Sequence, residues 1–512
     1  MATTLTFKDI IDIPVWRPAA PLPAATAAGV SVACDLRNST RNAPFNYALV
    51  SATNLQAYLN NNDGWLGVGS PALTGTFGAG ACCVFHPTQG PRGTLAASTS
   101  GTVITLSTAL PAAVGVNQLA NAGDGSGFFV RIIDNGAGGT GQTVTRQVVA
   151  NTAGTTPTLV LDSTLGFTPV VGSAYEFRSG RLFMLSAGTL AAGMWKYYDV
   201  LTNSFSGNLA TTNLPATVGT DSDLVALSEG YAPYNAAVAE GFIGNVTATA
   251  SSGTTITGSG MPATLQANQY RNFQVRIVTD ATNPTAAGQR RRISSHTGGA
   301  TGVFTVTAWA VTPSATATFV VENDDDKILL FTNQTNVYNY NIGGNTWDTT
   351  TWTAAPAAGA AGVSAAQSFG IAVDAANPPN ARTSNIFRLR GGNVATIDVL
   401  DIAGGANGTW TTAATYGNSG TLFNTGTSGA YDAVTNQGRY WYLAVGGTQQ
   451  FMRLDLLNRV LEPWTILRYT QGAAVVGRKL SLAFFIDGAT KAAFLYAQRS
   501  TGTEQFSILL QR

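Results

Sequence analysis

The chain has 512 residues, of which only 11% are charged, and 28 Lys and Arg against 27 Asp and Glu give it a formal net charge of +1. The lack of a basic excess argues against nucleic-acid binding through net charge, and three cysteines argue against a disulfide scaffold. With 45% hydrophobic residues and 57 glycines, the composition excludes a highly charged disordered chain and favours β-structure with many turns.

Residues 1–42 are predicted to form an extended N-terminal arm. They lack the basic and apolar stretches of a secretory signal, and no run of about 18 apolar residues occurs, so we expect a protein made in the cytoplasm without a membrane span. Prolines at positions 18, 21 and 23 favour an extended backbone. The apolar side chains of the arm either dock on a neighbouring subunit or pack across the base of their own molecule. The candidate assembly contacts in the arm are Phe7, Ile11, Ile13, Val15, Trp16 and Arg17.

Short runs rich in Val, Ile, Phe, Tyr and Thr recur along the chain. They are bounded by Gly, Asn, Pro and Asp, which predicts strands joined by turns. Helical periodicity is weak, and residues 51–60 are the best candidate for a short helix, with Ser51 as its N-cap. The predicted fold class is all-β. The adjacent Cys82 and Cys83 are expected to be reduced and buried in a strand.

An internal repeat indicates two homologous inserted β-domains. The sequence Gly101-Thr-Val-Ile-Thr-Leu followed by Phe128-Phe-Val-Arg-Ile returns as Gly253-Thr-Thr-Ile-Thr-Gly followed by Phe273-Gln-Val-Arg-Ile. Shorter matches continue the alignment at offsets of 144 to 152 residues, which need only short loop insertions. Units of roughly 80 residues are large enough for a small β-sandwich or barrel. The two predicted domains are 96–178 and 244–324.

A second repeated element follows each inserted domain. It consists of an apolar strand, a tyrosine-containing strand, a polar turn and an aromatic residue, and its two best copies run from Arg181 to Phe205 and from Lys327 to Trp347. The element resembles the blade of a kelch-type β-propeller, in which the aromatic residue would wedge between neighbouring blades. The blade-signature residues on this interpretation are Tyr198, Phe205, Tyr340, Trp347, Trp410 and Trp464.

The resemblance implies a kelch-like propeller of about five to seven blades, each a small sheet that buries its faces by stacking on its neighbours. We expect the first blade at 43–95, one or more blades at 179–243 and the remaining blades at 325–512. The two inserted domains separate these three parts of the propeller.

Few residues of the chain suit catalysis or metal binding. His86 and His296 are its only histidines, which argues against a histidine-based triad or metal site. No pair of carboxylates stands out, although composition leaves the paired carboxylates of a glycosidase open. The run Asn323-Asp-Asp-Asp-Lys327 could hold Ca²⁺, but a solvated junction is the favoured interpretation. We therefore predict a non-enzymatic protein without catalytic, metal or cofactor site.

One basic cluster, Gln289-Arg-Arg-Arg-Ile293, lies in the second inserted domain. It could contact an acidic partner or nucleic acid, but the aligned stretch 142–146 of the first domain has a single arginine. A surface strand of an interaction module is the favoured interpretation. The cluster adds three candidate assembly contacts, Arg290, Arg291 and Arg292.

The combination of a long β-rich chain, low charge, tandem β-inserts and an aromatic arm resembles structural proteins of tailed bacteriophages, of the tail, neck or capsid-decoration class. The resemblance implies a non-enzymatic virion subunit that assembles with itself and with other virion proteins. No membrane, cofactor or sequence-specific nucleic acid is implied, and no functional residue is carried over. Two alternatives stay open: a carbohydrate- or receptor-binding propeller of a tail appendage, and a glycan-degrading propeller enzyme.

Overall fold

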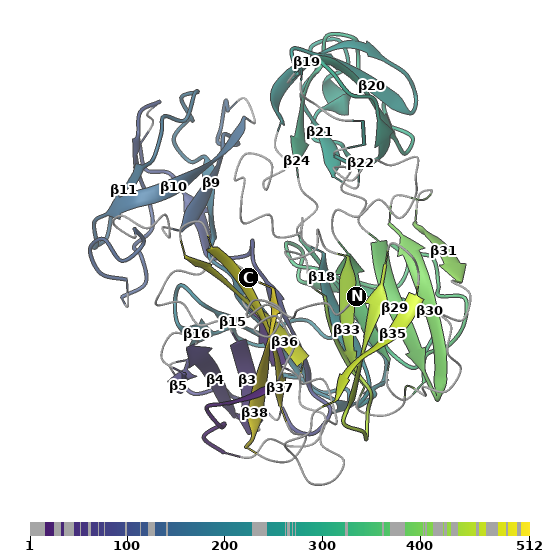
Figure 1. Cartoon of the computed structure of the whole chain (residues 1–512). Coiled ribbons are helices and arrows are strands. Elements are labelled where there is room, and N and C mark those ends of the chain that lie inside the picture. Colours follow the sequence, from purple (N-terminus) through teal and green to yellow (C-terminus); the bar gives the residue numbers. More distant parts are fainter. Residues whose placement is uncertain are drawn as a thin grey trace, which may run out of the picture.

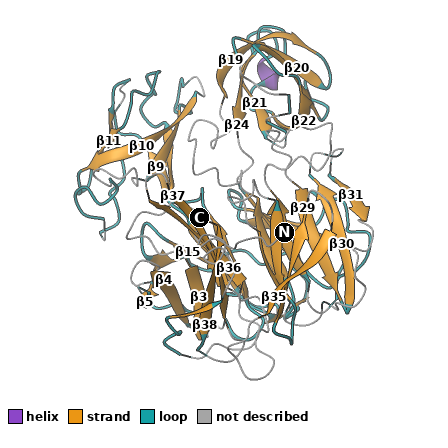
Figure 2. Ribbon diagram, viewed as in Figure 1, coloured by secondary structure: helices purple, strands orange, loops and turns teal. Residues whose placement is uncertain are grey.

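A computed structural model gives the fold of the chain. It describes residues 16–24, 32–34, 46–51, 53–59, 63–69, 71–75, 77–97, 100–112, 114–120, 128–139, 142–227, 243–261, 263, 267–268, 270–271, 273–322, 326–360, 363–368, 385–402, 404, 407–412, 423, 427–431, 439–456, 460–466, 480–487, 490–498 and 503–511. Within these residues the elements are 38 strands and one 3-10 turn, η1 (Pro284–Ala286) (Figure 2). The predicted all-β class is confirmed.

Six four-stranded antiparallel sheets form the blades of a β-propeller in the described part of the chain. Blade 1 consists of β2 (Val32–Cys34), β3 (Asn46–Ser51), β4 (Asn54–Leu59) and β5 (Gly64–Val68). Blade 2 consists of β6 (Cys82–His86), β13 (Arg181–Leu185), β15 (Trp195–Asp199) and β16 (Ser204–Phe205). Blade 3 consists of β18 (Asp223–Leu227), β25 (Lys327–Phe331), β26 (Val337–Asn341) and β27 (Thr346–Asp348).

The remaining three blades follow in chain order, and the last of them takes its outer strand from the N-terminal part of the chain. Blade 4 consists of β28 (Ser364–Ser368), β29 (Asn385–Gly391), β30 (Val394–Asp401) and β31 (Thr409–Thr412). Blade 5 consists of β32 (Ser428–Tyr431), β33 (Tyr440–Ala444), β34 (Gln450–Asp455) and β35 (Val460–Ile466). Blade 6 consists of β36 (Leu480–Asp487), β37 (Thr490–Gln498), β38 (Gln505–Gln511) and β1 (Arg17–Ala19).

The innermost strands of the blades close a ring. Each of β2, β6, β18, β28, β32 and β36 contacts the next, and β36 contacts β2 again. Both faces of a blade are therefore buried, which explains the continuous apolar runs in the sequence. On β29, for example, Ile386 packs into the core between blades 3 and 4, whereas Phe387 and Leu389 pack into the core between blades 4 and 5.

The two inserted domains are six-stranded antiparallel barrels on the same side of the propeller (Figure 1). Barrel 1 comprises β7 (Arg92–Thr94), β8 (Val103–Thr105), β9 (Phe129–Ile133), β10 (Thr143–Asn151), β11 (Thr158–Leu161) and β12 (Ala174–Arg178). Barrel 2 comprises β19 (Ile243–Ser251), β20 (Thr255–Ser259), β21 (Gln274–Thr279), β22 (Arg290–His296), β23 (Thr301–Val306) and β24 (Thr318–Glu322). A two-stranded ribbon, β14 (Gly188–Thr189) and β17 (Thr217–Val218), completes the strands.

The barrels share one strand order, as the internal repeat predicts. Barrel 2 is closed, and in barrel 1 a bridge between Leu95 and Leu106 joins the edge strands β7 and β8. The bulge between Val148 and Ala150 on β10 has its counterpart between Ile293 and Ser295 on β22. The bulges align residues 144–148 of barrel 1 with residues 289–293 of barrel 2, whereas the sequence alignment paired 142–146 with 289–293. The two alignments differ by two residues, and because side chains alternate along a strand, such a shift leaves each side chain on the same face.

The boundaries expected from sequence differ from the sheets at the blade junctions. Strand β6, expected in the first blade, belongs to blade 2, and β7 already belongs to barrel 1. Each barrel interrupts its blade after the innermost strand, so a blade is split across the insertion rather than completed before it. The helix expected at 51–60 is wrong: the alternating residues Leu55 and Ala57 of β4 are buried between blades, and this packing overrides the local helical pattern.

The expected arm 1–42 is part of the propeller where it is described. Strand β1 pairs with β38, so the N-terminal segment completes the last blade, and Trp16 is 2% exposed between blades 5 and 6. Residues 16–22 thus follow the second alternative for the arm and pack on their own molecule, where Leu22 is also buried. Trp16 is therefore not available as an assembly contact, whereas Arg17 is exposed. The expected contacts Phe7, Ile11, Ile13 and Val15 lie outside the described residues.

The blade-signature residues form a clasp between neighbouring blades. In blade 3 the Tyr340 hydroxyl and the backbone N–H of Ala210 both donate to Asn345 Oδ1, at 2.8 and 2.9 Å, and Trp347 Nε1 donates to the Ala210 carbonyl at 3.1 Å. Burial raises the pKa of Tyr340 to about 12, so its hydroxyl remains a donor at neutral pH. Ala210 lies in the connection that leaves blade 2, and the clasp therefore joins blades 2 and 3.

Blade 2 repeats the clasp against blade 1. Tyr198 and the backbone N–H of Gly69 donate to Asn203 Oδ1, at 3.0 and 2.8 Å. Phe205 covers Gly69 so closely that a Cβ there would lie 2.1 Å from the ring. Asn203 and its counterpart Asn345 both have positive φ, of 50° and 48°, which asparagine tolerates better than most residues.

Trp410 and Trp464 occupy different faces of their blades. Trp410 follows the pattern: it packs between blades 3 and 4, and its Nε1 donates to the Thr353 carbonyl at 2.8 Å. Trp464 packs on the opposite side, between blades 5 and 6, with its ring centroid 6.4 Å from that of Trp16. A register shift between β34 and β35 accompanies this change, and Leu461 takes the position facing blade 4.

Replacing Asn345 by alanine is expected to lower the free energy of unfolding by about 1–3 kcal/mol, because two hydrogen bonds are lost and alanine is strained at positive φ. Asn345→Gly loses the same bonds without the strain and should have a smaller effect. Urea denaturation of the two variants measures the difference. Equal stability of Asn345→Ala and the native protein would show that the clasp does not hold the blades together.

Candidate functional site

The described residues hold no cluster of three or more His, Cys, Asp and Glu that could bind a metal ion. His86 lies on β6 of the propeller and His296 on β22 of barrel 2, so the two histidines belong to different domains. Cys82 and Cys83 are buried on β6 and form no disulfide within the described residues, as expected. In the described part of the chain, no helix is long and apolar enough to cross a membrane. Of the acidic run, residues 323–325 lie outside the described residues, and Asp326 pairs with Lys327 at 3.1 Å.

Polar side chains of barrel 2, among them an arginine of the basic cluster, bond to the propeller at the junction between the two. Barrel 2 is tied to blade 4 by Arg271, whose Nη2 donates to Asp401 Oδ2 at 2.6 Å. The Nε of the same guanidinium donates to the Ser294 carbonyl on β22 at 2.8 Å, which fixes the side chain against its own barrel. The ion pair is partly exposed, at 17% and 33%, and on its own contributes little stability.

The three consecutive arginines of the basic cluster have three different roles. Arg292 joins the junction: its Nη1 donates to the Ile402 carbonyl at 2.9 Å, and its guanidinium lies 4.4 Å from the ring centroid of Trp352. Arg291 turns back on its own barrel, where it donates to the carbonyls of Ala308 and Arg290 at 2.8 Å each. Only Arg290 is exposed. Arg291 and Arg292, expected as assembly contacts on a surface strand, are therefore engaged within the molecule, because alternation along β22 and the nearby blade give the three side chains different surroundings.

Barrel 1 shows that the bonds of Arg291 are structural. The equivalent Arg146 donates to the Thr164 carbonyl from Nε at 2.8 Å and to the Thr145 carbonyl from Nη1 at 2.9 Å. Because both barrels use an arginine to hold the same loop, Arg291 serves barrel folding rather than a partner. Arg290 has Thr145 as its counterpart, and so it is an addition that distinguishes barrel 2.

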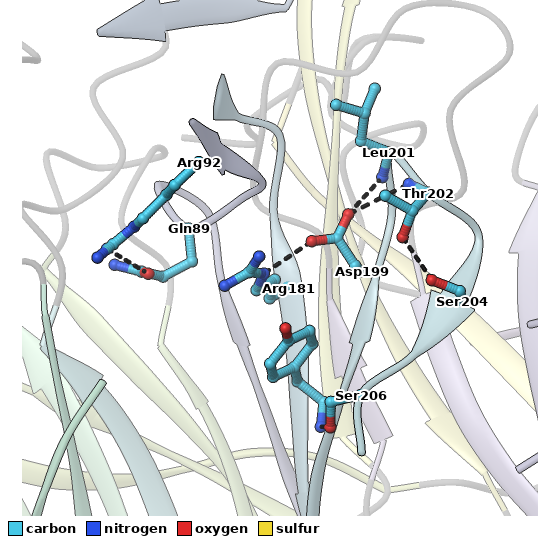
Figure 3. Close-up of polar contacts among 9 residues, drawn as sticks. Gln89, Arg92, Arg181, Asp199, Leu201, Thr202, Ser204 and Ser206 are labelled. Carbon is cyan, nitrogen blue, oxygen red and sulfur yellow. Dashed lines mark hydrogen bonds and ion pairs between the residues drawn. The ribbon is translucent and has the colours of Figure 1, made fainter. Parts of the chain in front are cut away.

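At the base of barrel 1, a polar network of blade 2 positions a turn of the propeller (Figure 3). Asp199 accepts from Arg181 Nε at 2.7 Å through one oxygen and from the backbone N–H groups of Leu201 and Thr202, at 3.1 and 3.2 Å, through the other. The turn places Leu201, 8% exposed, in the hydrophobic core of barrel 1. Barrel 1 is thus anchored by a buried side chain of the propeller.

Further contacts tie the domains together. Arg92 on β7 donates to Gln89 Oε1, in the connection from β6, at 3.1 Å (Figure 3). Its ion pair with Glu176 on β12 lies within barrel 1. The barrels touch each other where Arg276 Nη2 on β21 donates to Thr143 Oγ1 on β10 at 3.1 Å. The barrels and the propeller are therefore joined by contacts at each of their three borders.

A buried aspartate holds the corresponding loop in both barrels. Asp280 Oδ2 accepts from the backbone N–H of Ser314 at 2.7 Å, and Asp134 Oδ1 accepts from that of Val170 at 2.8 Å. Burial raises the pKa of Asp280, but hydrogen bonds from Ser314, Asn283 and Thr282 outweigh it, and the net pKa is lowered. These carboxylates therefore anchor a loop within their own barrels.

No protein-family model matches the chain, and no curated protein matches it. Solved structures similar to it include a structural-genomics protein of unknown function from Bacteroides thetaiotaomicron, 10% identical with a TM-score of 0.22, where the match covers 83% of this chain and 96% of that one. An auxiliary nutrient binding protein from the same species is 12% identical with a TM-score of 0.22, covering 83% and 85%. The WD40 domain of coronin from Toxoplasma gondii is 7% identical with a TM-score of 0.31, covering 96% and 89%. The propeller assignment itself depends on the strand pairing described above.

Sequence reasoning missed Arg271, Asp401, Leu201 and the pair of Arg181 and Asp199. Arg271 and Asp401 are 130 residues apart and belong to different domains, so no local pattern links them. Arg181 and Asp199 are cross-strand partners in the repeated blade element, and that register could have indicated their pairing.

Proposed function

We propose that the protein is a non-enzymatic structural subunit of a bacteriophage particle, which assembles with further copies of itself and with other virion proteins. The observation that carries the proposal is the attachment of two barrels to one side of a closed propeller. Loops, side-chain ties and a buried leucine hold the barrels, which suits a protein that presents fixed surfaces to partners. The low charge of the chain is also compatible with close packing of neighbouring copies.

The rival interpretation of a carbohydrate-binding propeller would be favoured by aromatic side chains exposed on one face. Among the described residues, the large hydrophobic side chains that are exposed are all leucine or valine: Leu66, Val103, Val116, Val149, Val171, Val394 and Val460. The described surface therefore gives no support to a sugar-stacking face.

The proposal predicts peptides of this chain in bacteriophage particles purified from the strain that carries its gene, detected by mass spectrometry. Light scattering should give a mass above that of a single chain at high protein concentration. Arg290→Glu reverses the exposed charge of the basic cluster and is expected to lower incorporation without changing the thermal unfolding temperature. Thr145→Glu places the same charge at the equivalent position of barrel 1 as a control. A monomeric protein absent from particles would refute the proposal.

A further inference from the structure

His296 is buried in barrel 2 with both ring nitrogens engaged. The residue is 4% exposed, and its Nε2 accepts the backbone N–H of Tyr270 at 2.8 Å. Its Nδ1 lies 2.8 Å from the Thr297 carbonyl, which can only accept. The imidazole is therefore neutral and carries its proton on Nδ1. The rings of Tyr270 and Phe304 pack against it, with centroids 6.0 and 5.0 Å away.

Barrel 1 builds the same connection from a residue that does not titrate. Asn151 Oδ1 accepts the backbone N–H of Leu119 at 2.9 Å, and its Nδ2 donates to the Thr152 carbonyl at 3.1 Å. In each barrel the backbone N–H of this residue donates to an asparagine of the facing loop, Asn117 or Asn268, at 3.1 and 2.9 Å. Those asparagines have matching φ values of 59° and 60°. His296 and Asn151 thus hold the equivalent loop of their barrels through equivalent hydrogen bonds.

The loop that His296 holds is the one that ties barrel 2 to the propeller. Arg271 follows Tyr270 directly, and it bridges the Ser294 carbonyl of β22 and the Asp401 carboxylate of blade 4. A loop that loses the Tyr270 bond loses the support next to this bridge. In barrel 1 the corresponding loop is held by Asn151 and has no titratable side chain in the bond.

We propose that His296 is a proton-sensitive latch, whose protonation frees the loop around Tyr270 and loosens the tie between barrel 2 and blade 4. Once protonated, Nε2 carries a hydrogen that faces the N–H of Tyr270, so the bond becomes a clash of two donors. The new charge would also be buried beside two aromatic rings. The charged groups on the neighbouring elements are Arg271 on the loop, Arg290, Arg291 and Arg292 on β22 and Asp401 on blade 4. None of their side chains is bonded to the imidazole.

The direction of the pH effect follows from the same geometry. Burial lowers the pKa of His296 below its usual 6.5, against the opposing effect of the bond to the Thr297 carbonyl. The released state has the ordinary pKa, so it binds a proton more readily than the latched state. The latch is therefore fully effective above about pH 6.5 and weakens as the pH falls below that value toward the pKa of the latched state.

Peptide-resolved hydrogen exchange on the full chain tests the latch. After correction for the intrinsic pH dependence, protection at 267–271 should fall between pH 7.5 and 5.0, by up to about 30-fold if the latched state does not bind the proton. His296→Asn installs the residue of barrel 1 and should abolish this fall. Asn151→His should create one at the loop 115–120 of barrel 1. Protection of β23 at pH 7.5 reports whether each variant is folded.

The outcomes separate the latch from a general acid response. Loss of protection in barrel 2 with barrel 1 unchanged, absent in His296→Asn, supports the proposal. An unchanged profile of the native protein, or an equal loss in His296→Asn, overturns it. If His296→Asn does not fold, the native protein and Asn151→His still decide, because the native protein should lose protection in barrel 2 alone, whereas Asn151→His, which keeps His296, should lose it in both barrels. None of these readouts depends on assembly.

Discussion

Replacing Trp16 by alanine is expected to lower the free energy of unfolding by about 3–5 kcal/mol, the usual loss for a fully buried large aromatic residue. Trp16 is 2% exposed in the core between blades 5 and 6, and its ring centroid lies 4.6 Å from that of Phe451. It also directly precedes β1, which pairs with β38 and completes the last blade. The substitution should therefore weaken the closure of the ring as well as one core.

Guanidinium denaturation followed by circular dichroism measures this loss, and the next residue supplies the matched control. Arg17 is exposed on β1, so Arg17→Ala should stay within about 0.5 kcal/mol of the native protein. Trp16→Phe retains most of the ring and should fall between the two. If Trp16→Ala and Arg17→Ala were equally stable, the N-terminal segment would not be what holds blades 5 and 6 together.

The blades could be predicted from sequence because their signals are local. Tyr340, Asn345 and Trp347 lie within eight residues, and the clasp they form recurs in blade 2 around Asn203, so the pattern is visible as a repeat. The closing strand could not be found in this way. It is three residues long and pairs with the last strand of the chain, and nothing in its own sequence specifies that partner.

For the junction between barrel 2 and the propeller, the sequence indicated the arginines of β22 but not the groups that they contact. The triple arginine marks β22 in the sequence, but the neighbour of each guanidinium depends on which face of the strand it occupies and on where blade 4 lies. Likewise, His296 reads in the sequence as an isolated histidine. Its role emerges from the equivalence with Asn151, which becomes visible when the strand registers of the two barrels are compared.

Asp398 is the site of the second large effect, since among the described residues it is the one carboxylate paired with Arg388. Arg390 binds both of its oxygens, at 2.8 and 2.6 Å, while Arg388 Nη1 lies 3.5 Å from one of them and donates to the Ala357 carbonyl at 3.0 Å. The side chains of Asp398 and Arg388 are 0% and 1% exposed, so neither charge is solvated. Burial lowers the pKa of Arg388, and the charge of Asp398 opposes this effect.

Asp398→Ala is expected to destabilise the propeller by about 3–5 kcal/mol, because it leaves a buried guanidinium without its counter-charge. The next blade offers a control of the same cross-strand type: Arg453 and Glu462 lie 2.8 Å apart, but their side chains are 32% and 36% exposed. Glu462→Ala should therefore cost less than about 1 kcal/mol. Denaturant unfolding of both variants makes the comparison. Similar small losses of stability would mean that other groups between blades 3 and 4 stabilise the charge of Arg388. The expected difference would establish that the contribution of a charge pair to the stability of this propeller depends on its burial and not on the number of ion pairs.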